Sequence, residues 1–165
     1  MNLIEPILME FSYEAHTTRR MLERVPEEHL AWKPHEKSMS LARLATHIAE
    51  IPGWVGAIVN QDEFVIGVGG YTPPTAGSVA EILDMFDNNV AAVSQTLQDQ
   101  TNEHLLAPWR LKKGDQVLVE MPRLAMIRTL LLSHIIHHRG QLSVYLRLHD
   151  VPLPPVYGPT ADEGF

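Results

Sequence analysis

Two histidines spaced four residues apart, His134 and His138, are well suited in type and spacing to hold a metal ion. Residues at i and i+4 of a helix lie one above the other on the same face. Two imidazoles placed in this way can bind one ion through nitrogen–metal bonds of about 2.0–2.1 Å. Leu131 and Leu142 share that predicted helix face, so we expect both imidazoles to point into the protein core.

A third histidine, His47, lies on the apolar stripe of another predicted helix, between Leu44 and Ile51. A single histidine on an apolar face is ordinarily a hydrogen-bonded core residue, and this is the alternative interpretation. Three neutral imidazoles in a core of aliphatic side chains would need partners for both nitrogens of each ring. A shared cation satisfies one nitrogen of each. The spacing therefore favours one divalent metal ion on His47, His134 and His138.

Composition and missing motifs exclude several other functions. The chain has 165 residues and no cysteine, which excludes disulfides and thiolate metal ligands from the protein itself. No Glu-x-x-His, His-Glu-x-x-His or phosphate-binding glycine motif occurs. The net charge of −7 without a basic run argues against nucleic acid as a partner. No apolar run reaches the roughly 20 residues of a membrane span, and the N-terminus lacks a basic signal region, so we expect a cytoplasmic protein and no membrane partner.

Four segments with helical periodicity must position the histidines. They cover about residues 2–25, residues 38 or 40 to 59, residues 78–100 and residues 122–149. Ser78 and Glu81 form a capping box at the start of the third segment. Pro52 cannot donate a backbone hydrogen bond, which predicts a kink in the second helix just after His47.

The connections complete the predicted fold. Residues 61–77 read as a loop that contains Gly67, Gly69 and Gly70. Residues 109–120 predict a short β-hairpin with Gly114 in its turn, between the third and fourth helices. We therefore expect a single all-α domain over residues 1–165, an antiparallel four-helix bundle with long connections and that short hairpin.

The sequence around the histidine pair resembles the DinB/YfiT-like family, the damage-inducible proteins that are distinct from the DNA polymerase of the same name. The resemblance rests on a run from Ser133 to Leu142 that includes His137-His138-Arg139-Gly140-Gln141. Upstream it rests on Ala31-Trp32-Lys33-Pro34, then on His47-Ile48-Ala49 and Trp54. The family implies a four-helix bundle with His47, His134 and His138 as metal ligands, nickel or zinc as the ion, and a homodimer.

Two classes of function remain open. Some members of the family are thiol-dependent transferases, which implies a metal-dependent enzyme that uses a low-molecular-weight thiol as its cofactor. The variant of this interpretation is a hydrolase, in which a metal-bound hydroxide attacks the substrate. The alternative is a noncatalytic stress protein that binds a metal or a small ligand. We expect Trp54, Arg139 and Tyr145 to line a pocket for a small-molecule ligand, while catalytic residues and the roles of His137 and Glu50 stay unassigned.

Overall fold

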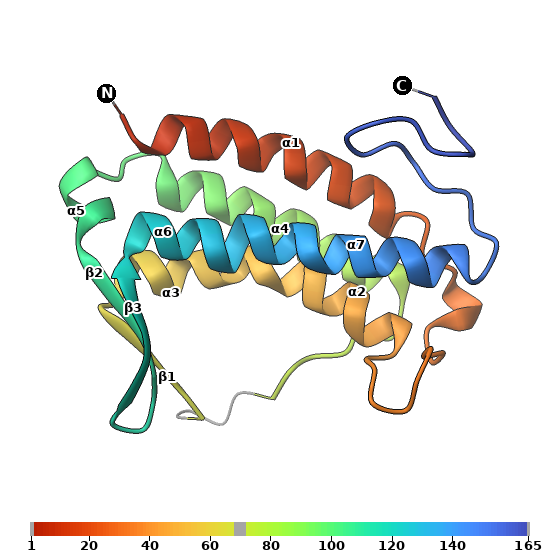
Figure 1. Ribbon diagram of the computed structural model, residues 1–165, viewed down its shortest axis with the longest axis horizontal. Helices are drawn as coiled ribbons and strands as arrows, with labels where there is room; N and C mark the ends of the chain where they lie inside the picture. The colour runs from red at the N-terminus through yellow and green to blue at the C-terminus, as the bar shows by residue number, and fades with distance from the viewer. Residues whose placement is uncertain (1, 68–71, 165) are drawn as a thin grey trace.

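The computed structural model describes residues 2–67 and 72–164, in which four helical segments pack side by side (Figure 1). The first is α1 (Ile4–Leu22), and the third is α4 (Val79–Leu97). The second consists of α2 (Leu41–Glu50), a 3₁₀ turn η2 (Ile51–Trp54) and α3 (Val55–Asn60). The fourth consists of α6 (Arg123–Ile127), a π-helical segment η3 (Arg128–Ser133) and α7 (His134–Arg147). Two short helices, η1 (Glu27–His29) and α5 (Asn102–Leu106), lie in the connections.

Each long segment packs against two neighbours: α1 and α2 both contact α4 and α7. Along the bundle α1 and α7 run in one direction, and α2 and α4 run in the other (Figure 1). The predicted antiparallel arrangement therefore holds for α1 against α4 and for α2 against α7. It needs correction for α2 beside α4 and for α1 beside α7, because the two helices of each pair begin at the same end of the bundle and run parallel. None of the described helices is long and apolar enough to cross a membrane.

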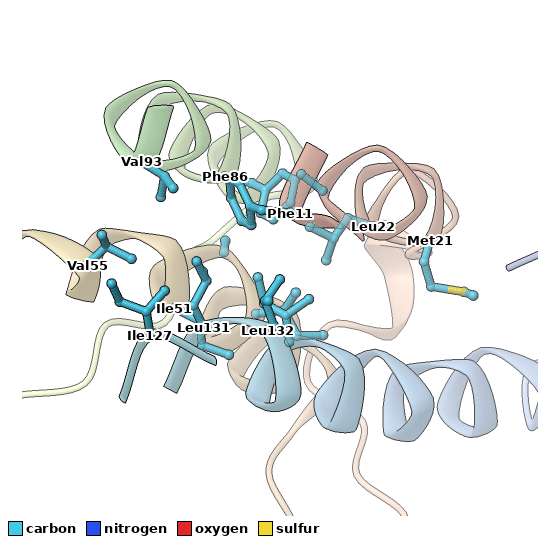
Figure 2. Packing of buried hydrophobic residues seen from close by; sticks show 14 of the residues in the cluster. Phe11, Met21, Leu22, Ile51, Val55, Phe86, Val93, Ile127, Leu131 and Leu132 are labelled. Atoms are coloured by element: carbon cyan, nitrogen blue, oxygen red, sulfur yellow. The ribbon is translucent and has the colours of Figure 1, made fainter. Parts of the chain in front are cut away.

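The core lies between the four segments. Figure 2 shows side chains from α1, α4 and the two composite segments pointing into one shared interior, with Phe11, Phe86, Ile51 and Leu131 among them. All four of these side chains are almost fully buried. Burial of a large apolar side chain contributes about 1.5–3 kcal/mol, so these helices are held mainly by their apolar faces.

The second helical segment is broken where proline requires it. Because Pro52 has no N–H, the α-helical ladder stops at Glu50 and the chain continues as the turn Ile51–Trp54. The break lies three residues later than predicted, so His47 itself remains within regular helix. The turn brings Trp54 back to the face that carries His47, with 5.5 Å between the two ring centroids.

A small sheet closes one end of the bundle (Figure 1). The predicted hairpin is confirmed as β2 (Pro108–Lys113) paired antiparallel with β3 (Gln116–Pro122), and Gly114 in its turn has a φ of 56°. A third strand, β1 (Glu63–Ile66), pairs parallel with β2. The prediction of an all-α fold and of a loop from residue 61 was therefore wrong at this strand. Gly69 and Gly70 of that predicted loop lie outside the described residues.

Candidate metal centre

Three histidines from two helical segments converge in the interior. His47 comes from α2, and His134 and His138 come from the first turns of α7. Ring centroids are 5.1 Å apart for His47 and His134, 4.5 Å for His47 and His138, and 4.6 Å for His134 and His138. One ring nitrogen from each residue lies within 4.8 Å of the other two. These three side chains, the histidine cluster, can hold a metal ion.

The outer nitrogens of two of these rings are occupied by acceptors. Nδ1 of His47 lies 2.5 Å from Oε1 of Glu50, a carboxylate that can only accept. Nδ1 of His138 lies 2.7 Å from Oε1 of Gln141. A proton on Nδ1 of each ring completes these hydrogen bonds and leaves the Nε2 lone pair available to a metal. This arrangement is typical of metal-ligating histidines, whose other nitrogen donates to a carboxylate or carbonyl.

The inner nitrogens of two rings have the spacing of two ligands to one cation. Nε2 of His47 and Nε2 of His134 are 3.3 Å apart. Two nitrogens bound to one tetrahedral ion with bonds of about 2.0–2.1 Å are separated by about 3.3 Å. A group that attracts lone pairs between the rings suits this geometry.

Burial keeps two of the rings neutral. Burial, with smaller contributions from the neighbouring His138 and His47, lowers the pKa of His134 from 6.5 to about 4. Burial also lowers the pKa of His138, partly offset by its hydrogen bond to Gln141. Neutral imidazole is the form that binds metal. At neutral pH His134 and His138 therefore offer lone pairs and no positive charge.

Glu50 is held in place by Arg43. Nη2 of Arg43 donates to Oε1 of Glu50 at 2.7 Å, and the Glu50 side chain is 8 % exposed. The spacing of Arg43 and Gln141 from the histidines is a weak indication of these contacts. Arg43 precedes His47 by four positions and Gln141 follows His138 by three, the spacings at which helical side chains meet. The sequence alone leaves the role of Glu50 unassigned and does not identify Arg43 or Gln141 as partners of the histidines.

Trp54 lies where the sequence predicted a pocket residue. Its ring centroid is 5.4 Å from that of His134 and 5.5 Å from that of His47. Trp54 also lines a cavity of about 350 Å³ between α3, η3 and the first two strands of the sheet. The histidine cluster and this cavity therefore share one wall.

The other two predicted pocket residues lie elsewhere. Arg139 is 2 % exposed and forms an ion pair with Glu14 of α1, and its Nη2 donates to the Tyr157 hydroxyl at 2.8 Å. These contacts fasten the C-terminal segment to the bundle. Tyr145 packs edge-on against Trp32, with centroids 5.5 Å apart, and its hydroxyl donates to the Met39 carbonyl. Neither residue has a described contact with the histidine cluster. Arg139 points about 100° away from its neighbour His138, and Tyr145 lies two turns further along α7.

His137 is exposed, although its ring centroid lies 4.8 Å from that of His138. Adjacent residues on a helix point about 100° apart, which carries His137 outward while His138 points inward. His137 is therefore a natural reference position for tests of the cluster.

The model of the DinB family matches residues 2–164 of this sequence. The chain belongs to the DinB family. Among curated proteins, it is similar to the uncharacterized protein YrdA of Bacillus subtilis (strain 168), with 24 % identity over 97 % of this chain and 91 % of YrdA. It is also similar to the uncharacterized protein YizA of the same strain, with 29 % identity over 67 % of this chain and 64 % of YizA.

Solved structures share the fold. A DinB-like protein from Bacillus cereus ATCC 10987 superimposes with a TM-score of 0.74 and 26 % identity, covering 93 % of this chain and 97 % of its own. The DinB-like protein YjoA from Bacillus subtilis gives a TM-score of 0.71 at 22 % identity, covering 93 % of this chain and 98 % of its own. The resemblance predicted from the residues around the histidine pair is therefore confirmed at the level of the family.

Proposed function

We propose that this DinB-family chain holds one divalent metal ion on His47, His134 and His138 and is an enzyme that activates a nucleophile there. The observation that carries the proposal is the orientation of the imidazole rings. Glu50 and Gln141 accept from the outer nitrogens of two rings, which leaves the Nε2 lone pairs directed inward, 3.3 Å apart for His47 and His134.

The donor set indicates the class of chemistry. Imidazole nitrogen suits zinc and nickel, the two ions that we expect, and three protein ligands are the number found in catalytic rather than structural zinc sites. An ion in such a site supplies a Lewis acid with an open position, which lowers the pKa of a thiol or of water. The protein has no cysteine, so a thiol nucleophile must come from a separate small molecule.

The residues of the chain then have distinct tasks. Glu50, held by Arg43, fixes the His47 ring with its Nε2 inward, and Gln141 does the same for His138. The lowered pKa of His134 keeps that ring unprotonated at neutral pH. Trp54 covers one side of the cluster and also lines the neighbouring cavity.

The apolar cavity beside the cluster favours an enzyme or a noncatalytic small-ligand binding protein over a protein that only stores metal. A store needs only the ligands, whereas a reaction needs a place for a substrate next to the activated nucleophile. We propose that the reaction transfers an electrophilic group of the substrate to a low-molecular-weight thiol, with hydrolysis of an ester as the variant.

The test is a panel of low-molecular-weight thiols, each offered with an electrophilic chromogenic reporter, together with a chromogenic ester. Untagged wild-type protein is compared with His134→Ala and with His137→Ala, which removes an exposed neighbouring imidazole. We expect metal-dependent turnover that His134→Ala loses and His137→Ala keeps. Equal turnover in all three proteins, or none with any thiol or ester while metal still binds, contradicts the enzyme and favours the binding protein.

A further inference from the structure

We propose that the cavity beside the histidine cluster is a binding site for an uncharged hydrophobic molecule, an aromatic or aliphatic group about the size of a bicyclic ring system. That the site takes such a ligand is independent of the proposed function. That the ligand is a substrate, held with one end towards the cluster, rests on the proposed function.

Three stretches of the chain, residues 54–66, 109–111 and 130, build this cavity. Trp54 and Ala57 come from η2 and α3, Phe64 and Ile66 from β1, and Trp109 and Leu111 from β2. Leu130 from η3 completes the side nearest to α7. The parallel pairing of β1 with β2 sets Phe64 beside Leu111, so the sheet presents a continuous apolar wall to α3.

The lining side chains offer almost nothing to water. All of them are apolar or aromatic, and Nε1 of Trp109 already donates to the Ala57 carbonyl at 3.3 Å. An ordered water needs two to four polar partners, which these side chains do not supply. A hydrophobic ligand therefore competes with poorly held solvent, which is the favourable case for binding.

The mouth of the cavity exposes side chains that folding alone would bury. Phe64 is 38 % exposed and Ile66 is 45 % exposed, and both lie on the same face of β1. Side chains at i and i+2 of a strand share a face, so the two together form an apolar rim. A ligand in the cavity would cover this rim and bury these exposed side chains.

Size and position limit the ligand. A cavity of about 150 Å³ accepts benzene, so the cavity here, at about 350 Å³, has room for about twice that volume. Trp54 belongs to the lining, and its ring lies 5.4 Å from His134 and 5.5 Å from His47. A ligand packed against Trp54 therefore has one end close to the cluster.

The test uses N-phenyl-1-naphthylamine, a neutral probe whose fluorescence rises in apolar surroundings, titrated against untagged protein. Ala57→Leu fills part of the cavity without changing a histidine, and Ala91→Leu makes the same change on an exposed face of α4. Phe64→Ser, at the exposed rim, supplies a second variant should Ala57→Leu disturb folding, which circular dichroism reports.

We expect saturable binding of one probe per chain. Ala57→Leu and Phe64→Ser should each weaken it at least tenfold, while Ala91→Leu leaves it unchanged. Absence of saturable binding, or equal affinities for all four proteins, overturns the site.

A second arm separates this inference from the proposed function. Cu²⁺, which quenches nearby fluorophores, is added to the probe complex of wild type and of His134→Ala. Quenching in wild type alone supports a ligand beside the cluster. Saturable probe binding without quenching overturns the link to the cluster but leaves the hydrophobic site standing.

Discussion

Replacement of Glu50 by glutamine tests whether the carboxylate beside His47 supports metal binding. Oε1 of Glu50 lies 2.5 Å from Nδ1 of His47 and 2.7 Å from Nη2 of Arg43. Glutamine keeps the shape and can keep an acceptor at the same place, but it removes the negative charge beside the His47 ring.

The expected loss of affinity follows from these contacts. Mutation of a group that orients a ligating histidine typically costs 10- to 100-fold in metal affinity. Arg43 already balances part of the charge of Glu50, so we expect the lower end of this range. A tenfold loss corresponds to about 1.4 kcal/mol of metal-binding free energy.

The assay is a competition titration of zinc and of nickel with a chromogenic chelator at pH 7.5. Glu10→Gln is the matched control, because Glu10 is a surface acid paired with Arg128 and lies far along the chain from the cluster. A loss near tenfold for Glu50→Gln with no change for Glu10→Gln supports the reasoning. Equal affinities for wild type and Glu50→Gln would show that the carboxylate plays no part in metal binding.

Three further outcomes are expected. The metal-free protein should lose stability as the pH falls from about 6.5 towards 4, because the unfolded chain takes up a proton there and buried His134, with its pKa lowered to about 4, does not. After allowance for the partial exposure of His134, we expect the free energy of unfolding in urea to fall by about 1 kcal/mol between pH 7 and pH 5. The same pH dependence of the free energy of unfolding in His134→Ala would contradict this. Tyr157→Phe should lower the free energy of unfolding by about 1.5 kcal/mol, since its hydroxyl accepts from buried Arg139; thermal denaturation with no shift refutes it. We also propose a homodimer through the exposed apolar pair Val144, on α7, and Leu148, which follows the last residue of α7. Sedimentation should show twice the chain mass for wild type and a single-chain mass for Leu148→Glu, and a single-chain mass for both removes the proposal.

Periodicity predicts the helices and the inward position of the histidines well, because a helix face is set by local spacing. The stripe Leu131, His134, His138 and Leu142 alternates at three and four residues, and Leu131, His138 and Leu142 are indeed buried. The capping signal at Ser78 is also met, since its side chain accepts from the Glu81 amide. Such features depend on neighbours a few residues apart.

Features set by distant partners were harder to predict. Strand β1 is only four residues long, and its pairing with β2 depends on a segment more than 40 residues away. The π-helical segment before His134 leaves no pattern distinct from an ordinary helix. The placement of Arg139 likewise depends on Glu14 in α1, which charge and spacing along α7 alone do not reveal.

Metal content of untagged protein tests the central claim most directly. Wild type, His47→Ala, His134→Ala and His137→Ala are purified in parallel, supplied with zinc or nickel, freed of loosely held ions and measured by elemental analysis. The convergence of three inward nitrogens predicts about one equivalent of metal per chain in wild type and in His137→Ala, and less than a tenth in the other two variants. Less than a tenth of an equivalent in wild type, or equal content in all four proteins, would contradict a metal centre on His47, His134 and His138.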